Sequence, residues 1–207
     1  MAISIKVVSV FIGSPGGLDL ERRTAQRITS EVNRSHSEHW GCQIKLVGWE
    51  ETLPGYIRAQ SRINQDLDKC EYFVGVLWNH WGSKPDDDSE YTSGFEEEVE
   101  RARSRIGRGE MNDIALFFKE IPQPQLKDPG PSVTKVLEFK EKCVREHKLL
   151  FKSFGEIQEF ESNFRATIEE IGWRESALSA RAMEATLKPD DSNRHHSNRQ
   201  RRYPLIT

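Results

Sequence analysis

Apolar residues follow two alternating patterns along this chain. Short, nearly continuous runs of β-branched and aromatic residues are typical of buried strands, and apolar residues returning every three or four positions are typical of amphipathic helices. The strand-type runs are Ile5–Ile12, Gln43–Trp49, Tyr72–Trp78, Asp113–Phe118 and Lys148–Phe151. The helix-type stretches start near Asp19 and then cover Ala59–Lys69, Phe95–Ile106, Val133–His147 and Ile157–Ile171, with a further helix from Trp173. This alternation predicts an α/β fold, in which a parallel sheet of about five strands is flanked by helices in three layers.

Two segments between these elements carry strong turn signals. The first strand ends in Gly13-Ser14-Pro15-Gly16-Gly17, which resembles a phosphate-binding turn between a strand and a helix. A tight turn with no ligand fits the same residues equally well, because neither G-x-G-x-x-G nor a P-loop motif occurs. Asp19 is expected to cap the helix that follows. The proline-rich segment Ile121–Pro131 is expected to be a loop or a lid.

Composition limits the domain organisation and the partners. The net charge is −3, but the last twenty positions carry five basic residues and two acids, so the rest of the chain has a net charge of −6. An acidic body argues against nucleic acid as a partner. The sequence predicts one α/β domain over residues 1–187 and a disordered polar tail over 188–207, because the tail has too few apolar residues to offset its ordering entropy.

Several classes of site and location are not expected. No apolar run approaches the ~20 residues that span a bilayer, and the first twelve residues are expected to form a strand rather than a signal segment. The three cysteines are widely spaced without a C-x-x-C pair, as in reduced intracellular proteins, so we expect a cytoplasmic location. The six histidines have no metal-ligand spacing, so no metal site and no bound cofactor are expected.

The segment Ser93–Ala102 (SGFEEEVERA) places four carboxylates in the first two turns of the third helix. At about 100° per residue, the apolar residues of this helix form one narrow stripe. Glu98 flanks that stripe most closely, whereas Glu97 lies nearly opposite and is expected to face solvent. A half-buried carboxylate has a raised pKa and suits catalysis, which makes Glu98 the candidate. A solvated acidic helix start, favoured by the helix dipole, explains the same residues without function.

The loop after the third strand contains two tryptophans and a histidine in the segment Leu77–Ser83 (LWNHWGS). Trp78 is expected to pack in the core. Trp81 is expected to be exposed, where it can stack on the ring of a nucleotide. His80 has the chemistry of a general acid or base but no visible partner in the sequence.

Taken together, three motifs resemble a known family. The segment Val10–Arg22 (VFIGSPGGLDLER), the loop Leu77–Ser83 and the helix start Ser93–Ala102 occur in the order seen in a TIR-like family of unknown function. That family commonly forms the N-terminal domain of STAND (NACHT-type) NTPases. The likeness is good over Ile5–Phe118 and thinner as far as Trp173, and the chain departs from it where Gly13 replaces the first serine of the motif. The resemblance implies a flavodoxin-like or TIR-like strand order.

The resemblance also implies a chemistry. In TIR-domain NADases and in nucleoside deoxyribosyltransferases, a glutamate early in the corresponding helix acts at an N-glycosidic bond. Glu98 fits that glutamate by its spacing from Ser93 and Ala102, and Glu96 is the second candidate. The implied substrate is NAD or another nucleotide, and the residues expected to bind it are Gly13, Ser14, Pro15, Gly16, Arg22, Trp49, Trp81, Ser83, Ser93 and Glu96.

Three functions remain open at this point. The first is a TIR-like effector that cleaves NAD in a defence or cell-death system and is a homo-oligomer when activated. The second is a non-catalytic module that self-associates, in company with a STAND NTPase. The third is a nucleotide N-glycosidase or deoxyribosyltransferase. All three are compatible with the absence of membrane and nucleic-acid signals.

Overall fold

The computed structural model describes residues 5–48, 59–146 and 149–187. The strands are β1 (Lys6–Gly13), β2 (Cys42–Val47), β3 (Tyr72–Leu77), β4 (Asp113–Lys119) and β5 (Phe151–Phe154). The helices are α1 (Asp19–Trp40), α2 (Ala59–Leu67), α3 (Gly94–Gly107), α4 (Gln123–Lys127), α5 (Pro131–Glu146) and α6 (Ile157–Leu187). All neighbouring strands pair in parallel, in the order β2-β1-β3-β4-β5. This is the flavodoxin-like doubly wound order, so the predicted fold class is confirmed.

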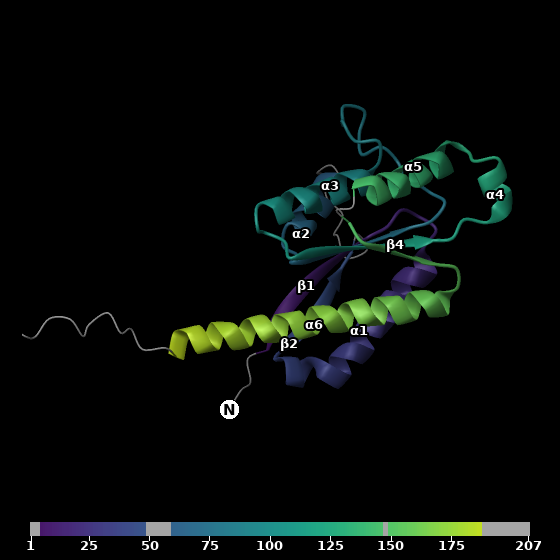
Figure 1. Cartoon of the computed structure of the whole chain (residues 1–207). Helices are drawn as coiled ribbons and strands as arrows, with labels where there is room; N and C mark the ends of the chain where they lie inside the picture. The colour runs from purple at the N-terminus through teal and green to yellow at the C-terminus, as the bar shows by residue number, and fades with distance from the viewer. Residues whose placement is uncertain (1–4, 49–58, 147–148, 188–207) are drawn as a thin grey trace, which may run out of the picture.

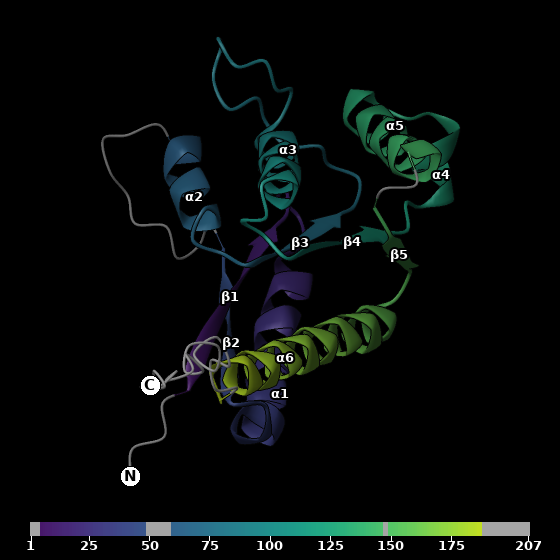
Figure 2. The same cartoon turned by 60° about the vertical axis from the view of Figure 1, so that its left-hand side comes forward.

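The sheet separates two apolar cores. Figures 1 and 2 both show α1 and α6 on one face of the sheet and α2, α3 and α5 on the other. Alternate residues of β1 serve the two faces: Val8, Val10 and Ile12 pack against α1 and α6, whereas Phe11 packs on the side of α3. The three-layer arrangement therefore follows from the two-residue period of strands whose faces are both buried.

Parallel strands bring their carboxyl ends to one edge of the sheet. In the order observed here, the chain leaves β1 for α1 on one face and leaves β3 for α3 on the other. The topological switch point, where open α/β sheets bind ligands, therefore lies between the ends of β1 and β3. Gly13 pairs with Gly75 near this point, so the predicted glycine-rich turn begins at the switch point.

Three element boundaries differ from the sequence prediction. The fifth strand is Phe151–Phe154 rather than Lys148–Phe151, because it is Phe151 that pairs with Leu116, and Leu150 is 92% exposed. The apolar run before Phe151 does not mark the pairing register. The proline-rich segment contains α4, and α5 starts at Pro131, since proline is tolerated in a first helical turn, where its missing N–H would have no partner.

The last helix is longer than expected. α6 runs without a break from Ile157 to Leu187, so the residues after Trp173 continue it rather than form a separate helix. Figure 1 shows its far end projecting beyond the sheet. The predicted tail, residues 188–207, lies outside the described residues, as does Trp49 at the end of the predicted second strand.

Candidate functional site

A cleft of about 390 Å³ opens at the switch point between β1 and β3. Its lining comes from the turn after β1, the loop after β3, α2 and the start of α3. The lining residues are Ser14, Pro15, Gly16, Gln60, Ile63, His80, Gly82, Ser83, Gly94, Phe95 and Glu98. The cleft therefore joins the glycine-rich turn to the acidic helix start, two features separated by some eighty residues in the sequence.

The start of α3 is fixed by a reciprocal set of caps. The Ser93 hydroxyl, which is fully buried, accepts a hydrogen bond from the backbone N–H of Glu96 at 3.1 Å. The Glu96 carboxylate reaches back and accepts from the backbone N–H and the hydroxyl of Thr92, at 2.7 and 2.8 Å. This arrangement resembles a capping box. The structure thus places Ser93 and Glu96, both predicted to bind substrate, in contacts that set where the helix begins.

Glu98 lies two residues beyond that cap and is buried, with 8% of its surface exposed. Its Oε1 accepts a hydrogen bond from the Gln60 side-chain amide on α2, at 3.2 Å. Burial raises the pKa of Glu98 from its ordinary 4.5 to about 7; the Gln60 hydrogen bond opposes this rise and the charge of Glu97 adds to it. At neutral pH this carboxyl group therefore exchanges readily between its ionised and protonated forms.

Gly13 makes room for the same carboxylate. A Cβ atom at position 13 would lie 2.6 Å from Glu98 Oε2 and 2.9 Å from the ring of Phe73. A side chain at position 13 would therefore displace the Glu98 carboxylate or the Phe73 ring from its present position.

Glu97 does not face solvent, contrary to the sequence prediction. Its exposed fraction is also 8%, and its Oε1 accepts a hydrogen bond of 2.6 Å from the Asn64 side chain on α2. The prediction considered only the apolar stripe of α3, which packs on the sheet. Because α2 covers a second side of α3, a residue opposite the stripe can also be buried.

The turn after β1 is held by Arg22. The guanidinium of this buried arginine donates to the Ser14 hydroxyl at 2.9 Å and to Asp19 at 2.6 Å. Asp19 is thus the first residue of α1 and pairs with Arg22, whereas the N-cap is Leu18, which makes no side-chain cap, so the predicted capping role of Asp19 is wrong. Gly17 has a φ of 88°, which favours glycine and completes the turn.

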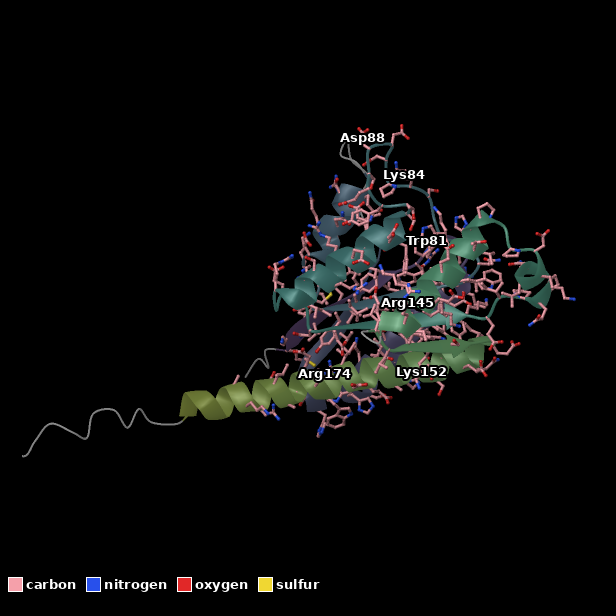
Figure 3. The ribbon with its side chains drawn as sticks, turned by 45° about the horizontal axis from the view of Figure 1, so that its top comes forward. Trp81, Lys84, Asp88, Arg145, Lys152 and Arg174 are labelled. Atoms are coloured by element: carbon pink, nitrogen blue, oxygen red, sulfur yellow. The ribbon has the colours of Figure 1, made fainter. Side chains whose placement is uncertain are left out.

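Trp81 is buried, not exposed as predicted. Only 5% of its surface is accessible; its indole N–H donates to Thr92, and its ring lies 5.4 Å from that of Phe139 on α5. Figure 3 shows Trp81 close to the helices, while Lys84 and Asp88 lie further out on the same loop. Trp81 therefore anchors the loop that carries His80 and Ser83, and it is not among the residues that line the cleft.

The sequence interpretation missed Gln60 and found no partner for His80, although both residues line the cleft. Gln60 was not singled out, although it occupies the same helix face as Ile63 and Leu67, one helical turn apart at each step. The sequence signal that could have identified Gln60 was an amide side chain on the apolar face of a predicted helix. His80 had no visible partner in the sequence; in the structure its Nδ1 lies 3.4 Å from the Ser132 hydroxyl at the start of α5.

Other chemistries find less support in the described residues. No group of three or more histidine, cysteine, aspartate or glutamate side chains suited to a metal ion occurs among them. The three cysteines are buried and unpaired, and burial raises the pKa of the Cys70 thiol to about 12, which suppresses the nucleophilic thiolate. Within the same residues, no helix combines the length and apolar character that crossing a membrane requires.

Residues 9–169 match the model of a family described as a domain of unknown function, DUF4062, and the chain belongs to that family. Comparison with curated proteins gives no significant match. Among solved structures, the chain is similar to the TIR domains of the activated Roq1 resistosome that recognises the pathogen effector XopQ. The identity is 11% and the TM-score 0.40, with 87% of this chain and 99% of that chain covered.

Proposed function

We propose that this chain cleaves the nicotinamide–ribose bond of NAD, and that Glu98 is the catalytic carboxylate. The observation that carries the proposal is the placement of a buried glutamate with a pKa near 7 beside the glycine-rich turn, in a cleft at the switch point. A cleft of about 390 Å³ is within the usual range for small-molecule sites. Perturbed carboxyl groups in clefts are enriched at active sites.

The reaction needs little besides a well-placed negative charge. The C1′–N bond breaks, and its electron pair leaves with nicotinamide, which is thereby neutralised. Positive charge develops on the ribose as an oxocarbenium-like species, and ionised Glu98 stabilises that charge. Water then adds to C1′ and releases one proton, giving ADP-ribose. The ionised form of Glu98 does this work, so the rate rises with pH through about 7.

The polar groups around the cleft support nucleotide binding. Ser14, Gly16 and Ser83 line it with hydroxyl and backbone groups, and α1 begins directly after the turn without a side-chain cap. Free N–H groups at a helix start favour a phosphate. The arrangement is thus suited to a ligand whose anionic part lies toward α1 and whose reacting sugar lies toward Glu98.

The test is release of nicotinamide by the purified chain, measured by chromatography with wild type, Glu98→Gln and Glu96→Gln. Glu98→Gln keeps the side-chain volume, and we expect at least a ~100-fold loss of rate, as when a single group that stabilises transition-state charge is removed. Glu96→Gln is the matched control, since its carboxylate faces Thr92. Equal rates for wild type and Glu98→Gln contradict the proposal, and a loss confined to Glu96→Gln transfers the role to Glu96.

The same assay distinguishes two alternative functions. A non-catalytic, self-associating module is favoured by the structural bonds of Ser93, Glu96 and Trp81, and it predicts no turnover even when chains are clustered on an oligomeric scaffold. Turnover that appears only on clustering instead supports an effector activated as a homo-oligomer, for example through a STAND NTPase. Cleavage of deoxynucleoside monophosphates in preference to NAD identifies a nucleotide N-glycosidase or deoxyribosyltransferase.

A further inference from the structure

Helix α2 buries two side-chain amides one turn apart. Gln60 and Asn64 have exposed fractions of 8% and 6%, and they share a face of α2 with Leu67, which is fully buried. An amide left without partners in such a place destabilises the folded state. Both amides face α3, where they donate hydrogen bonds to Glu97 and Glu98. These hydrogen bonds explain why amides occupy positions that otherwise suit apolar residues.

The two amides connect the two buried carboxylates in a directed chain of hydrogen bonds. The Asn64 amide nitrogen donates to Glu97 Oε1 at 2.6 Å, which leaves its oxygen to accept from Gln60 Nε2 at 3.3 Å. The same Gln60 nitrogen donates to Glu98 Oε1 at 3.2 Å. An ionised carboxylate has no hydrogen to donate, so it can only accept hydrogen bonds. Glu97 therefore fixes the orientation of the Asn64 amide, and Asn64 in turn fixes the orientation of the Gln60 amide.

Two glycines leave room for the last two residues of this series of hydrogen bonds, Gln60 and Glu98. A Cβ at Gly94, the first residue of α3, would lie 2.4 Å from Gln60 Oε1, and a Cβ at Gly13 would lie 2.6 Å from Glu98 Oε2. Gln60 therefore lies directly against the backbone of α3, and Glu98 lies directly against the turn after β1. In the part of the chain that the structure describes, Gln60 donates the hydrogen bond to Oε1 of Glu98, and Oε2 has none.

We infer that Gln60 is the positioning residue of this site: it holds Oε1 of Glu98 and thereby presents Oε2 as the oxygen that meets the substrate. The inference rests on the proposed function for the identity of the reaction, although the contact itself is a property of the resting protein. Gln60 acts through Glu98 and stabilises its ionised form, because an amide N–H binds a carboxylate more strongly than a carboxylic acid.

The charged and titratable groups around Glu98 define what else affects its ionisation. On α3, Glu97 opposes it by like charge. From the loop after β3, His80 lines the same cleft, and from the turn after β1, Ser14 brings the guanidinium of Arg22 to that side. From α2, the group facing Glu98 is the neutral amide of Gln60. Removing that amide therefore changes the hydrogen bonding of Glu98 without adding or removing a charge.

The experiment follows the side-chain carboxyl carbon of Glu98 by ¹³C NMR across a pH titration, with the signal assigned by its loss in Glu98→Gln. Gln60→Met keeps the length of the side chain and removes the donor, so the pKa of Glu98 rises by about one unit, the equivalent of one hydrogen bond. Gln65→Met is the matched control, because Gln65 is an exposed glutamine on the same helix, and it leaves the titration unchanged.

A second variant covers the case in which Gln60→Met does not fold. Gly94→Ala retains Gln60, is favourable for a helix, and displaces the amide by contact, so it raises the pKa in the same direction. An unchanged Glu98 titration in both variants overturns the positioning role. The readout does not use NAD, so a wild-type protein that fails to release nicotinamide refutes the proposed reaction while the Gln60 effect is still measured.

Discussion

Glu98 and Glu175 are both buried glutamates, but they lie at opposite ends of the same parallel sheet. Glu175 on α6 lies at the amino ends of the strands, is fully buried, and accepts hydrogen bonds from Lys6 at 2.6 Å, Tyr72 at 2.7 Å and Asn112 at 3.0 Å. Glu98 lies at the carboxyl ends, accepts from Gln60 at 3.2 Å and borders a cleft. The two glutamates are therefore both buried but differ in the number of hydrogen bonds that they accept.

The two environments have opposite energetic consequences. Glu175 holds α6 against the first residues of β1 and β3 through its hydrogen bonds to Lys6 and Tyr72, so it stabilises the fold. The burial of Glu98 is compensated by one amide, so its ionised form is costly to the fold and chemically available. Stability is commonly lower at an active site for this reason. Each prediction below tests one side of this contrast, beginning with the largest effect.

Glu175→Leu is expected to lower the free energy of unfolding by about 3 kcal/mol, because it leaves the buried Tyr72 hydroxyl without its partner and removes the acceptor of Lys6 and Asn112. The measurement is urea unfolding followed by circular dichroism. Glu170→Leu, at an exposed position five residues earlier on α6, is the control and should change stability far less. A loss of under 1 kcal/mol at Glu175 would show that this network is not a structural lock.

Glu98→Gln is expected to raise the free energy of unfolding, and only at higher pH. The folded pKa of about 7 lies above the unfolded value of 4.5, so the native protein binds the extra proton and loses stability as the pH rises from 4.5 to 7. Glutamine mimics the protonated acid and escapes that loss, which amounts to about 3 kcal/mol at pH 8.

Thermal unfolding at pH 5 and pH 8 measures this effect of Glu98→Gln. The variant should match the wild type closely at pH 5 and exceed it at pH 8. Glu90→Gln, which replaces an exposed glutamate on the preceding loop, controls for the loss of a surface charge. The contrast with Glu175 would fail if Glu98→Gln were destabilising at pH 8.

Glu97→Gln should act in the opposite direction to Glu98→Gln, although the two residues are adjacent. The Glu97 carboxylate accepts a short hydrogen bond from Asn64, and replacing its charge weakens that bond by about 1 kcal/mol. The prediction is a modest loss of stability at pH 8 in the same thermal unfolding series. A gain like that of Glu98→Gln would mean that both carboxylates are similarly under-supplied with partners.

The order of the fold could be predicted because strands and helices have different apolar periods. The apolar runs predicted strands β1 to β4 within two residues of their observed bounds. The alternation of strands with helices along the chain correctly implied that the strands pair in parallel. β5 was misplaced because it is a strand of four residues with Phe154 as its one buried position, so its apolar residues do not define its register. Periodicity likewise identified Glu98 as the acid nearest the stripe of α3.

The contacts between elements could not be predicted in this way. The apolar period of a helix shows which of its faces packs on one surface. Helix α3 packs against both the sheet and α2, so Glu97 and Glu98 are both buried, and each accepts a hydrogen bond from a different residue of α2. The burial of Trp81 depends on Phe139 of α5, which lies 58 residues away in the sequence. Such pairings depend on how the elements pack together.

The sequence by itself thus determined the element types, the parallel α/β order and the candidate glutamate, because these follow from local period and chain connectivity. The tertiary structure decided which carboxylates have partners. It brought Gln60 to Glu98, Asn64 to Glu97, and Tyr72 with Asn112 to Glu175. The ionisation of a buried acid depends on the few polar atoms within about 3 Å of it, and those atoms come from distant parts of the chain.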